Sequence, residues 1–236
     1  MGALNDMIQR QGGLPQLPVG WRMQQALRTA EGSPFAGDFV VATRRGGCDH
    51  LEFCLVDVSG KGNDVGARAL QLSGAMGGIL GSLPPAAMLP ATNEWVLEQD
   101  WHEGFATGVH VCVDLATGDY EVRSAGHPPV VIRAGGSGRW TALEASGPAL
   151  GLLHDPEYDA SHGRLLPGDV MVVCTDGVVE NPTRDVTHGV DRLTGVAEDV
   201  LRGDHTRAAE RVMDKVAVDG DDRALVILVR VPLGAM

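Results

Sequence analysis

Between residues 105 and 144, four short β-like runs follow one another with only turn-length connections. The connections carry the turn signals TG, GHPP and GGSG, which are typical of links between neighbouring strands. Strands in direct succession, without strict alternation with helices, favour antiparallel sheets. The runs are FATGVHVCVDL, DYEVRSAG, PPVVIRA and RWTALE.

The rest of the chain combines further strands with helices. Additional strands are predicted at residues 37–43, 50–58, 169–176 and 222–231. Helices are predicted at residues 63–80, 84–99, 189–201 and 205–217, with Pro90 breaking or kinking the second of them. The small residues of the first helix suggest close packing on its neighbours. No repeat, linker or low-complexity stretch divides the 236 residues, so we expect one α+β domain over residues 1–236.

Composition narrows the classes of partner and compartment. The formal net charge of -12 disfavours nucleic acid and anionic membranes, because phosphate-rich partners recruit basic surfaces. The N-terminus lacks a signal-peptide pattern, and no apolar run approaches a membrane span, so we expect a cytoplasmic protein. The four cysteines show no CxxC pairing. We interpret them as buried reduced thiols, with a zinc or disulfide site as the alternative.

Aspartates recur at the predicted strand ends. Asp38 starts a strand after Gly37, Asp57 ends LVDV, Asp176 ends MVVCTD, and Asp221 and Asp222 stand before the last strand. A single such aspartate is a turn former or cap, but several brought together would form an oxygen-rich, negative pocket. A hard cation such as Mg²⁺ or Mn²⁺ resolves that repulsion. Spacing alone leaves their convergence open.

Six ordered motifs carry a family resemblance: GDF, DVSGKG, SAGHPP, LLPGD, TDGVVE and the terminal DDRALVILV. In this order they resemble bacterial PPM-type (type 2C) serine/threonine phosphatases, most of all the branch named for the sporulation phosphatase SpoIIE. The resemblance runs from about residue 15 to residue 231. It implies an α-β-β-α sandwich in which two central antiparallel sheets, flanked by helices, carry two Mn²⁺ or Mg²⁺ ions at one edge.

The resemblance also implies residue roles. Asp38, Asp57, Asp176 and Asp221 would be the metal-ligating carboxylates, with Asp57 bridging the two ions and the carbonyl of Val58 as a further ligand. Asp222 remains the alternative to Asp221. Two cations roughly 3.5–4 Å apart would activate a water molecule for in-line attack on a phosphoserine. The aspartates would then act as metal ligands rather than as general acid and base.

Two departures from the family pattern concern groups around the ligands. Val40 and Val41 follow GDF where this branch often has Tyr-Asp, and Ala224 replaces a common Thr. Neither change removes a predicted ligand, although losses of supporting groups can lower metal affinity by 10–100-fold, roughly.

Several other residues have a plainer interpretation than catalysis. His127 is expected to serve a hairpin turn, Cys174 to be a core thiol, and Ser59 to be a turn residue. Lys61 is equally consistent with phosphate contact and with a solvated turn. Eukaryotic relatives place an arginine before the Gly-Asp pair and a histidine where Ser59 stands. Both are missing, so we expect a preference for a folded phosphoprotein over small esters.

The leading function is therefore hydrolysis of phosphoserine or phosphothreonine on a regulatory protein, by resemblance an anti-anti-sigma-factor-like partner. The alternatives are a pseudophosphatase that binds such a partner without chemistry, and a phosphoesterase for small molecules. The substrate, the controlling signal and the oligomeric state, a homodimer included, stay open. Helix 63–80 could couple metal-site assembly to partner binding or be a static core helix.

Overall fold

The fold was analysed in a computed structural model, which describes residues 13–30, 36–44, 49–60, 63–99, 101, 104–180, 186–203, 205–216 and 220–232. Lys61 and Cys48 therefore lie outside the described residues, as do residues 31–35 shortly before Gly37. Within these ranges the chain forms two five-stranded sheets, and every strand pairing in them is antiparallel.

One sheet, here called sheet A, gathers strands from both ends of the chain. Its order is β1-β10-β9-β6-β7. The strands are β1 (Trp21–Arg28), β10 (Arg223–Arg230), β9 (Val170–Cys174), β6 (Val131–Arg133) and β7 (Trp140–Ala142).

The other sheet, sheet B, is mostly a meander of sequential strands. Its order is β2-β3-β4-β5-β8. The strands are β2 (Phe39–Arg44), β3 (His50–Val58), β4 (Ala106–Asp114), β5 (Asp119–Ala125) and β8 (Ala160–Arg164).

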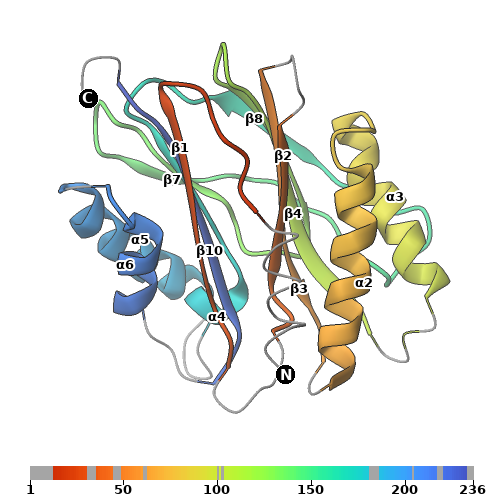
Figure 1. The fold of residues 1–236 in the computed structure, drawn as a ribbon. Helices are drawn as coiled ribbons and strands as arrows, with labels where there is room; N and C mark the ends of the chain where they lie inside the picture. The colour runs from red at the N-terminus through yellow and green to blue at the C-terminus, as the bar shows by residue number, and fades with distance from the viewer. Residues whose placement is uncertain are drawn as a thin grey trace.

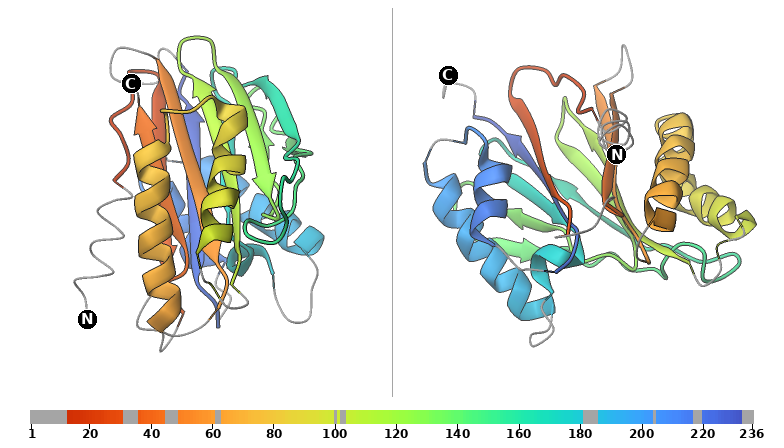
Figure 2. Two further views of the ribbon diagram at one scale, coloured as in Figure 1. Left: turned by 90° about the vertical axis from the view of Figure 1, so that its right-hand side faces the viewer. Right: turned by 60° about the horizontal axis from the view of Figure 1, so that its bottom comes forward.

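Helices cover the outer face of each sheet, which gives four layers (Figures 1 and 2). Sheet B is covered by α2 (Asn63–Ile79) and α3 (Pro85–Glu98). Sheet A is covered by α4 (Asp176–Val179), α5 (Val186–Leu201) and α6 (Ala208–Lys215). This arrangement confirms the predicted α+β sandwich of two antiparallel sheets flanked by helices.

The core is three apolar layers, and the central one lies between the sheets. Strand β3 shows how the sequence builds them. Phe53 and Leu55 belong to the layer between the sheets, whereas Cys54 and Val56 belong to the layer under α2 and α3. Because side chains alternate along a strand, Asp57 falls on the same side as Leu55 and faces the space between the sheets.

Two strands were not predicted, and both are edge strands. β1 and β8 stand at the outer edges of sheets A and B, and both are rich in polar residues. Edge strands tolerate polar side chains because they are only partly covered, so the apolar alternation that signals a strand is weak. The short helix α4 was also not expected.

Two expectations about the helices need correction. Helix α3 contains Pro90 and continues through it to Glu98, so Pro90 does not break the helix. Of the small residues of α2, Ala69 and Ser73 are buried against the rest of the fold, whereas Gly74, Gly77 and Gly78 are exposed and a methyl group at any of these three would meet nothing within 4 Å.

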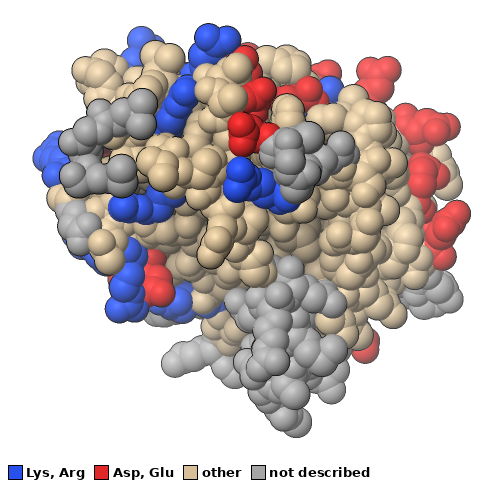
Figure 3. Space-filling view, turned by 45° about the horizontal axis from the view of Figure 1, so that its top comes forward, with Lys and Arg blue, Asp and Glu red and all other residues tan. Residues whose placement is uncertain are grey.

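Charge is unevenly spread over the surface. Figure 3 shows Lys and Arg gathered over one side of the visible face, while Asp and Glu gather on the side that carries α3 in Figure 1. Among the described residues, no helix is both long and apolar enough to cross a membrane.

Candidate metal centre

The pairing of the strands explains why the aspartates meet. β2 begins beside the end of β3, with Phe39 opposite Val56, so Asp38 and Asp57 lie at one end of sheet B. β9 ends beside the start of β10, with Cys174 opposite Leu225, so Asp176 and the Asp221–Asp222 pair lie at one end of sheet A. The two ends face each other across the layer between the sheets.

Asp38 is the most buried of the five aspartates, with 2% of its surface exposed. Its Oδ2 accepts a hydrogen bond of 2.7 Å from the Thr175 hydroxyl, which comes from sheet A. Burial, and after it the charge of Asp57, raises the pKa of Asp38 well above its usual range, although the Thr175 bond opposes this. The contact places Asp38 directly between the two sheets.

Asp57 is held at the end of β3 opposite Thr107. Burial, followed by the charges of Asp176 and Asp221, raises the pKa of Asp57 to about 7, against the opposing effect of a hydrogen bond with Asp38. Carboxylates that raise one another's pKa lie within electrostatic reach of one another. The structure therefore brings the predicted aspartates of both sheets into one negative cluster.

Asp176 begins α4 directly after the β9 end. Burial, and then the charge of Asp221, raises the pKa of Asp176. Gly177 behind it has a packing reason, since a Cβ there would collide with the backbone carbonyl of Asp222. The chain behind this strand-end carboxylate therefore passes close to the backbone that leads into β10.

Asp221 and Asp222 have different surroundings. Both carboxylate oxygens of Asp222 accept backbone hydrogen bonds, Oδ1 from Ala30 at 2.7 Å and Oδ2 from Gly37 at 2.6 Å. Burial raises the pKa of Asp222, while these two bonds lower it. Asp221 accepts only the backbone N–H of Asp222 at 2.9 Å among the hydrogen bonds described, and its charge raises the pKa of Asp57 and Asp176. Asp222 thus binds the backbone with both oxygens, and its charge also raises the pKa of Asp38 and Asp57, whereas Asp221 is exposed.

The Val58 carbonyl also lies at this edge. A Cβ added to Gly37 would stand 2.8 Å from the Val58 oxygen, so the two segments approach too closely for a larger residue. Glycine at position 37 thus lets the backbone before Asp38 pass beside the end of β3.

Thr175 is a site residue that sequence reasoning missed. It is completely buried, and its hydroxyl accepts the N–H of Ala224 at 2.9 Å while donating to Asp38. The signal was present in the TDG motif, one residue before Asp176. Ala224, which replaces the common Thr of the family, donates its backbone N–H to this hydroxyl.

Chemically the cluster offers carboxylate and carbonyl oxygens, which suit hard divalent cations. Within the described ranges, no three His, Cys, Asp or Glu side chains already stand in a geometry that could hold a metal ion. The donor types fit such an ion, and the mutual repulsion favours one, but the carboxylates would have to turn toward it on binding.

The remaining sequence candidates lie in structural positions. His127 is buried. Its backbone N–H donates a hydrogen bond of 3.2 Å to the Ser124 hydroxyl of the same turn, and its ring Nδ1 lies 3.1 Å from the Thr107 hydroxyl. Burial lowers the pKa of His127 to about 3, so the ring is neutral.

Ser59 bonds the backbone of Phe105 across the strand ends, as expected of a turn residue. Of the described cysteines, Cys54, Cys112 and Cys174 form no disulfide.

Residues 48–232 match the family model described as Stage II sporulation protein E (SpoIIE). The chain belongs to the SpoIIE family. The matched region includes four of the five clustered aspartates, since only Asp38 precedes it.

Solved structures share the fold of this SpoIIE-family chain. The RsbU and RsbW domains of Rv1364c from Mycobacterium tuberculosis superpose with a TM-score of 0.79 at 22% identity, covering 94% of this chain and 62% of that one. The PP2C phosphatase domain of SpoIIE from Bacillus subtilis, with a fragment of its regulatory domain, gives 0.74 at 17% identity, covering 91% and 64%. The catalytic domain of the serine/threonine phosphatase PstP, in complex with two manganese ions, gives 0.65 at 18%, covering 90% and 99%. The SpoIIE-family chain therefore has the fold of PP2C-type serine/threonine phosphatases.

One curated relative matches part of the SpoIIE-family chain. Protein IcfG from Synechocystis sp. is 30% identical over 83 residues, which cover 34% of this chain and 13% of that protein. The chain thus spans a small part of that relative, and under two thirds of the first two structures named above.

Proposed function

We propose that this SpoIIE-family chain is a metal-dependent protein serine/threonine phosphatase that uses two Mn²⁺ or Mg²⁺ ions. The observation that supports it most is the convergence of aspartates from both sheets, where burial, and then the charges of neighbouring aspartates, raise the pKa of Asp38, Asp57, Asp176 and Asp222. Asp38, Asp57, Asp176 and Asp221 would hold the ions together with the Val58 carbonyl. When bound, the ions would neutralise the phosphoryl group and activate an attacking water.

The protein's own residues have separate tasks in this proposal. Thr175 orients the Asp38 carboxylate, and Asp222 fixes the backbone at Ala30 and Gly37 around the site. His127 is neutral and bonded within its turn, which favours the aspartates as metal ligands over this histidine as a general acid. Positioning and charge neutralisation would then provide most of the rate enhancement.

The proposed substrate is a phosphorylated regulatory protein of the anti-anti-sigma-factor type. The support is the family and the fold shared with the RsbU and RsbW domains of Rv1364c. The proposal treats residues 1–236 as one phosphatase domain and includes a reducing, cytoplasmic setting, in keeping with the absence of disulfides among the described cysteines. A homodimer is compatible with it but not required by it.

A pseudophosphatase is the second candidate, favoured by two observations. In the part of the chain that the structure describes, no ligand set stands ready for a metal ion, and Ala224 replaces a Thr of the family pattern. Such a protein would bind its partner without releasing phosphate.

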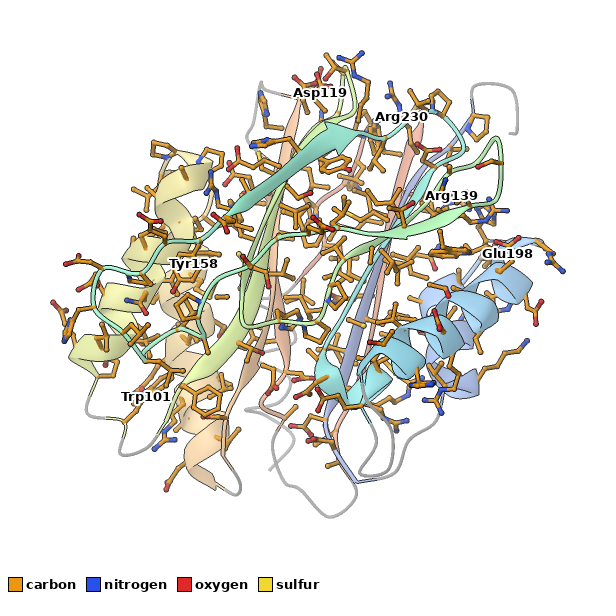
Figure 4. The ribbon with its side chains drawn as sticks, turned by 180° about the vertical axis from the view of Figure 1, so that it is seen from behind. Trp101, Asp119, Arg139, Tyr158, Glu198 and Arg230 are labelled. Carbon is orange, nitrogen blue, oxygen red and sulfur yellow. The ribbon has the colours of Figure 1, made fainter. Side chains whose placement is uncertain are left out.

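Phosphate release separates the two candidates. We expect the wild type to hydrolyse p-nitrophenyl phosphate and a phosphoserine peptide with Mn²⁺, and not with EDTA. Asp57→Asn should abolish both activities, whereas Asp119→Asn should not, because Asp119 pairs with Arg164 at the opposite end of the molecule (Figure 4). Mn²⁺-independent activity, or full activity of Asp57→Asn in excess Mn²⁺, would contradict the proposed metal centre.

A further inference from the structure

Two adjacent leucines stand exposed in the loop between β7 and β8. Leu152 and Leu153 are 54% and 55% exposed. Single exposed apolar residues are common on protein surfaces, but large neighbouring ones often mark interaction sites. We refer to the turn Gly151–Leu153 as the leucine ledge.

The ledge is held firmly by a buried amide of α3. Asn93 is completely buried; its Oδ1 accepts the Gly151 N–H at 2.9 Å and its Nδ2 donates to the Leu153 carbonyl at 3.0 Å. Gly151 has a φ of +85°, and a Cβ there would press on Val96 of the same helix. The two leucines are thus fixed in place at their backbone rather than exposed on a loose loop.

The ledge lies on the side of the fold that carries the aspartate cluster. Leu150, just before it, exchanges two backbone hydrogen bonds with Ala106, at 2.8 and 3.1 Å. Ala106 in turn pairs with Val58, next to Asp57. Two strand spacings, about 10 Å, therefore separate Val58 from Leu150.

Acidic side chains surround the ledge. Asp155 and Glu157 follow it in the sequence, Glu94 and Glu98 lie on the adjoining helix α3, and all four are exposed. Tyr158, at the end of the loop, lies beside α3 in Figure 4. Burial, and then the charge of Glu94, raises the pKa of Tyr158 to about 12. This is the acidic side of the molecule in Figure 3.

We infer that the leucine ledge docks a segment of the phosphoprotein substrate that carries an aliphatic side chain beside Lys or Arg. The apolar contact would come from the two leucines and the charge complementarity from the carboxylates around them. A second copy of this chain is a poorer occupant, because its net charge of -12 has the wrong sign for this surface. The inference rests on the proposed phosphatase function and adds a specificity element to it.

The geometry sets a spacing for the substrate. An extended chain advances about 3.3–3.6 Å per residue, so a span of 10–15 Å, roughly, corresponds to three to five residues, roughly. A leucine and a lysine about four residues from the phosphoserine would reach the ledge, whereas the same pair about nine residues away would not.

Synthetic phosphoserine peptides test this. In a Gly/Ala/Ser background, a Leu-Lys pair is placed about four or about nine residues from the phosphoserine, on either side, and compared with a parent that lacks it. We expect the pair at the shorter spacing, on one side, to raise kcat/KM roughly tenfold, the effect of partly burying one leucine. The double variant Leu152→Ser/Leu153→Ser should lose this gain.

The matched control is Leu166→Ser. Leu166 is 57% exposed and lies near Arg230, at the end of the molecule opposite Trp101 (Figure 4). This variant should keep the gain, and all three proteins should hydrolyse p-nitrophenyl phosphate equally fast.

Two results would overturn the inference while the phosphatase proposal stands: a gain that persists in the double variant, or no gain at any spacing. A double variant that changes only the oligomeric state, measured by light scattering, would also overturn it and assign the ledge to self-association. If the wild type releases phosphate from neither peptide nor p-nitrophenyl phosphate with Mn²⁺, the proposed function itself fails and the docking inference falls with it.

Discussion

The Thr175 hydroxyl of sheet A donates a 2.7 Å hydrogen bond to the buried carboxylate of Asp38 at the start of β2 in sheet B. The hydroxyl cannot turn away freely, because its oxygen accepts the N–H of Ala224 on the neighbouring strand. A carboxylate with little access to water is thereby given one fixed partner and one fixed orientation. The orientation of a proposed ligand thus depends on a residue from the opposite sheet.

Thr175→Val should therefore weaken metal binding. The variant keeps the shape but removes the donor to Asp38 and leaves the Ala224 N–H unpaired. We expect 10–100-fold weaker Mn²⁺ activation, about the loss typical for a supporting group of a metal site. Titration of activity with Mn²⁺ measures it. Thr175→Ser, which keeps the hydroxyl, should remain near the wild type; equal losses in both variants would show that packing, not the hydrogen bond, matters.

The two terminal aspartates should fail in different ways. Asp222→Ala leaves the N–H groups of Ala30 and Gly37 without an acceptor, so we expect a loss of about 2–4 kcal/mol in the free energy of unfolding. Asp221→Ala should leave stability nearly unchanged in EDTA but greatly reduce Mn²⁺ binding. Denaturant unfolding and calorimetric metal titration of both variants decide it. The reverse pattern would make Asp222 the ligand.

The metal-free protein should lose stability as pH rises. The pKa of Asp57 is raised from 3.8 to about 7 in the fold, so its contribution is fully present below about pH 4 and is lost as pH rises through about 7. Asp38, Asp176 and Asp222 shift in the same direction. For Asp57 alone the loss is at most about 4 kcal/mol, since each unit of pKa corresponds to about 1.4 kcal/mol.

Melting temperatures in EDTA at pH 5 and pH 8 test this expectation. Asn resembles a protonated Asp, so Asp57→Asn should change little at pH 5 and stabilise the protein at pH 8. Excess Mn²⁺ should remove most of the wild-type difference between the two pH values. A metal-free protein that is as stable at pH 8 as at pH 5 would argue against a repulsive cluster.

Helix α2 should tolerate, and gain from, alanine at its exposed glycines. Gly74 and Gly77 have no neighbours that a methyl group would meet, and glycine inside a helix costs about 0.5–1 kcal/mol relative to alanine. The double variant should therefore melt a few degrees higher, roughly 2–4 °C per kcal/mol, with unchanged phosphatase activity. Gly177→Ala is the contrasting variant and should lose activity. A loss of activity without a loss of stability in the α2 variant would instead support a coupling role for that helix.

The sequence predicted the layers of the fold because its central strands have two apolar faces. Strand β3 alternates between the layer between the sheets and the layer under α2 and α3, so it is recognisable from its run of apolar residues. β1 and β8 lack this signal because they are edge strands with polar residues. Local sequence has no feature that separates such a strand from a polar loop.

The aspartates of the site could be predicted as a set, but their individual surroundings could not. Asp221 and Asp222 are identical neighbours in the sequence. What distinguishes them is the backbone of Ala30 and Gly37, nearly two hundred residues away. Thr175 likewise acquires its role only when β9 is placed opposite β2, and that contact between the sheets has no local signature.

The clustered carboxylates are divided between the two sheets, and this has a mechanical consequence. In the metal-free protein, separating the sheets at this edge relieves the repulsion between the carboxylates. In the metal-bound protein, the same separation would pull the ligands away from the cation and would therefore be unfavourable. Bound ions would therefore connect the two sheets. At metal concentrations above the dissociation constant, the free energy of unfolding would rise with the logarithm of the metal concentration. Amide exchange at the ends of β3 and β9 would then slow when metal is added. Because the ions join the two sheets, the ends of both strands would become protected to the same extent.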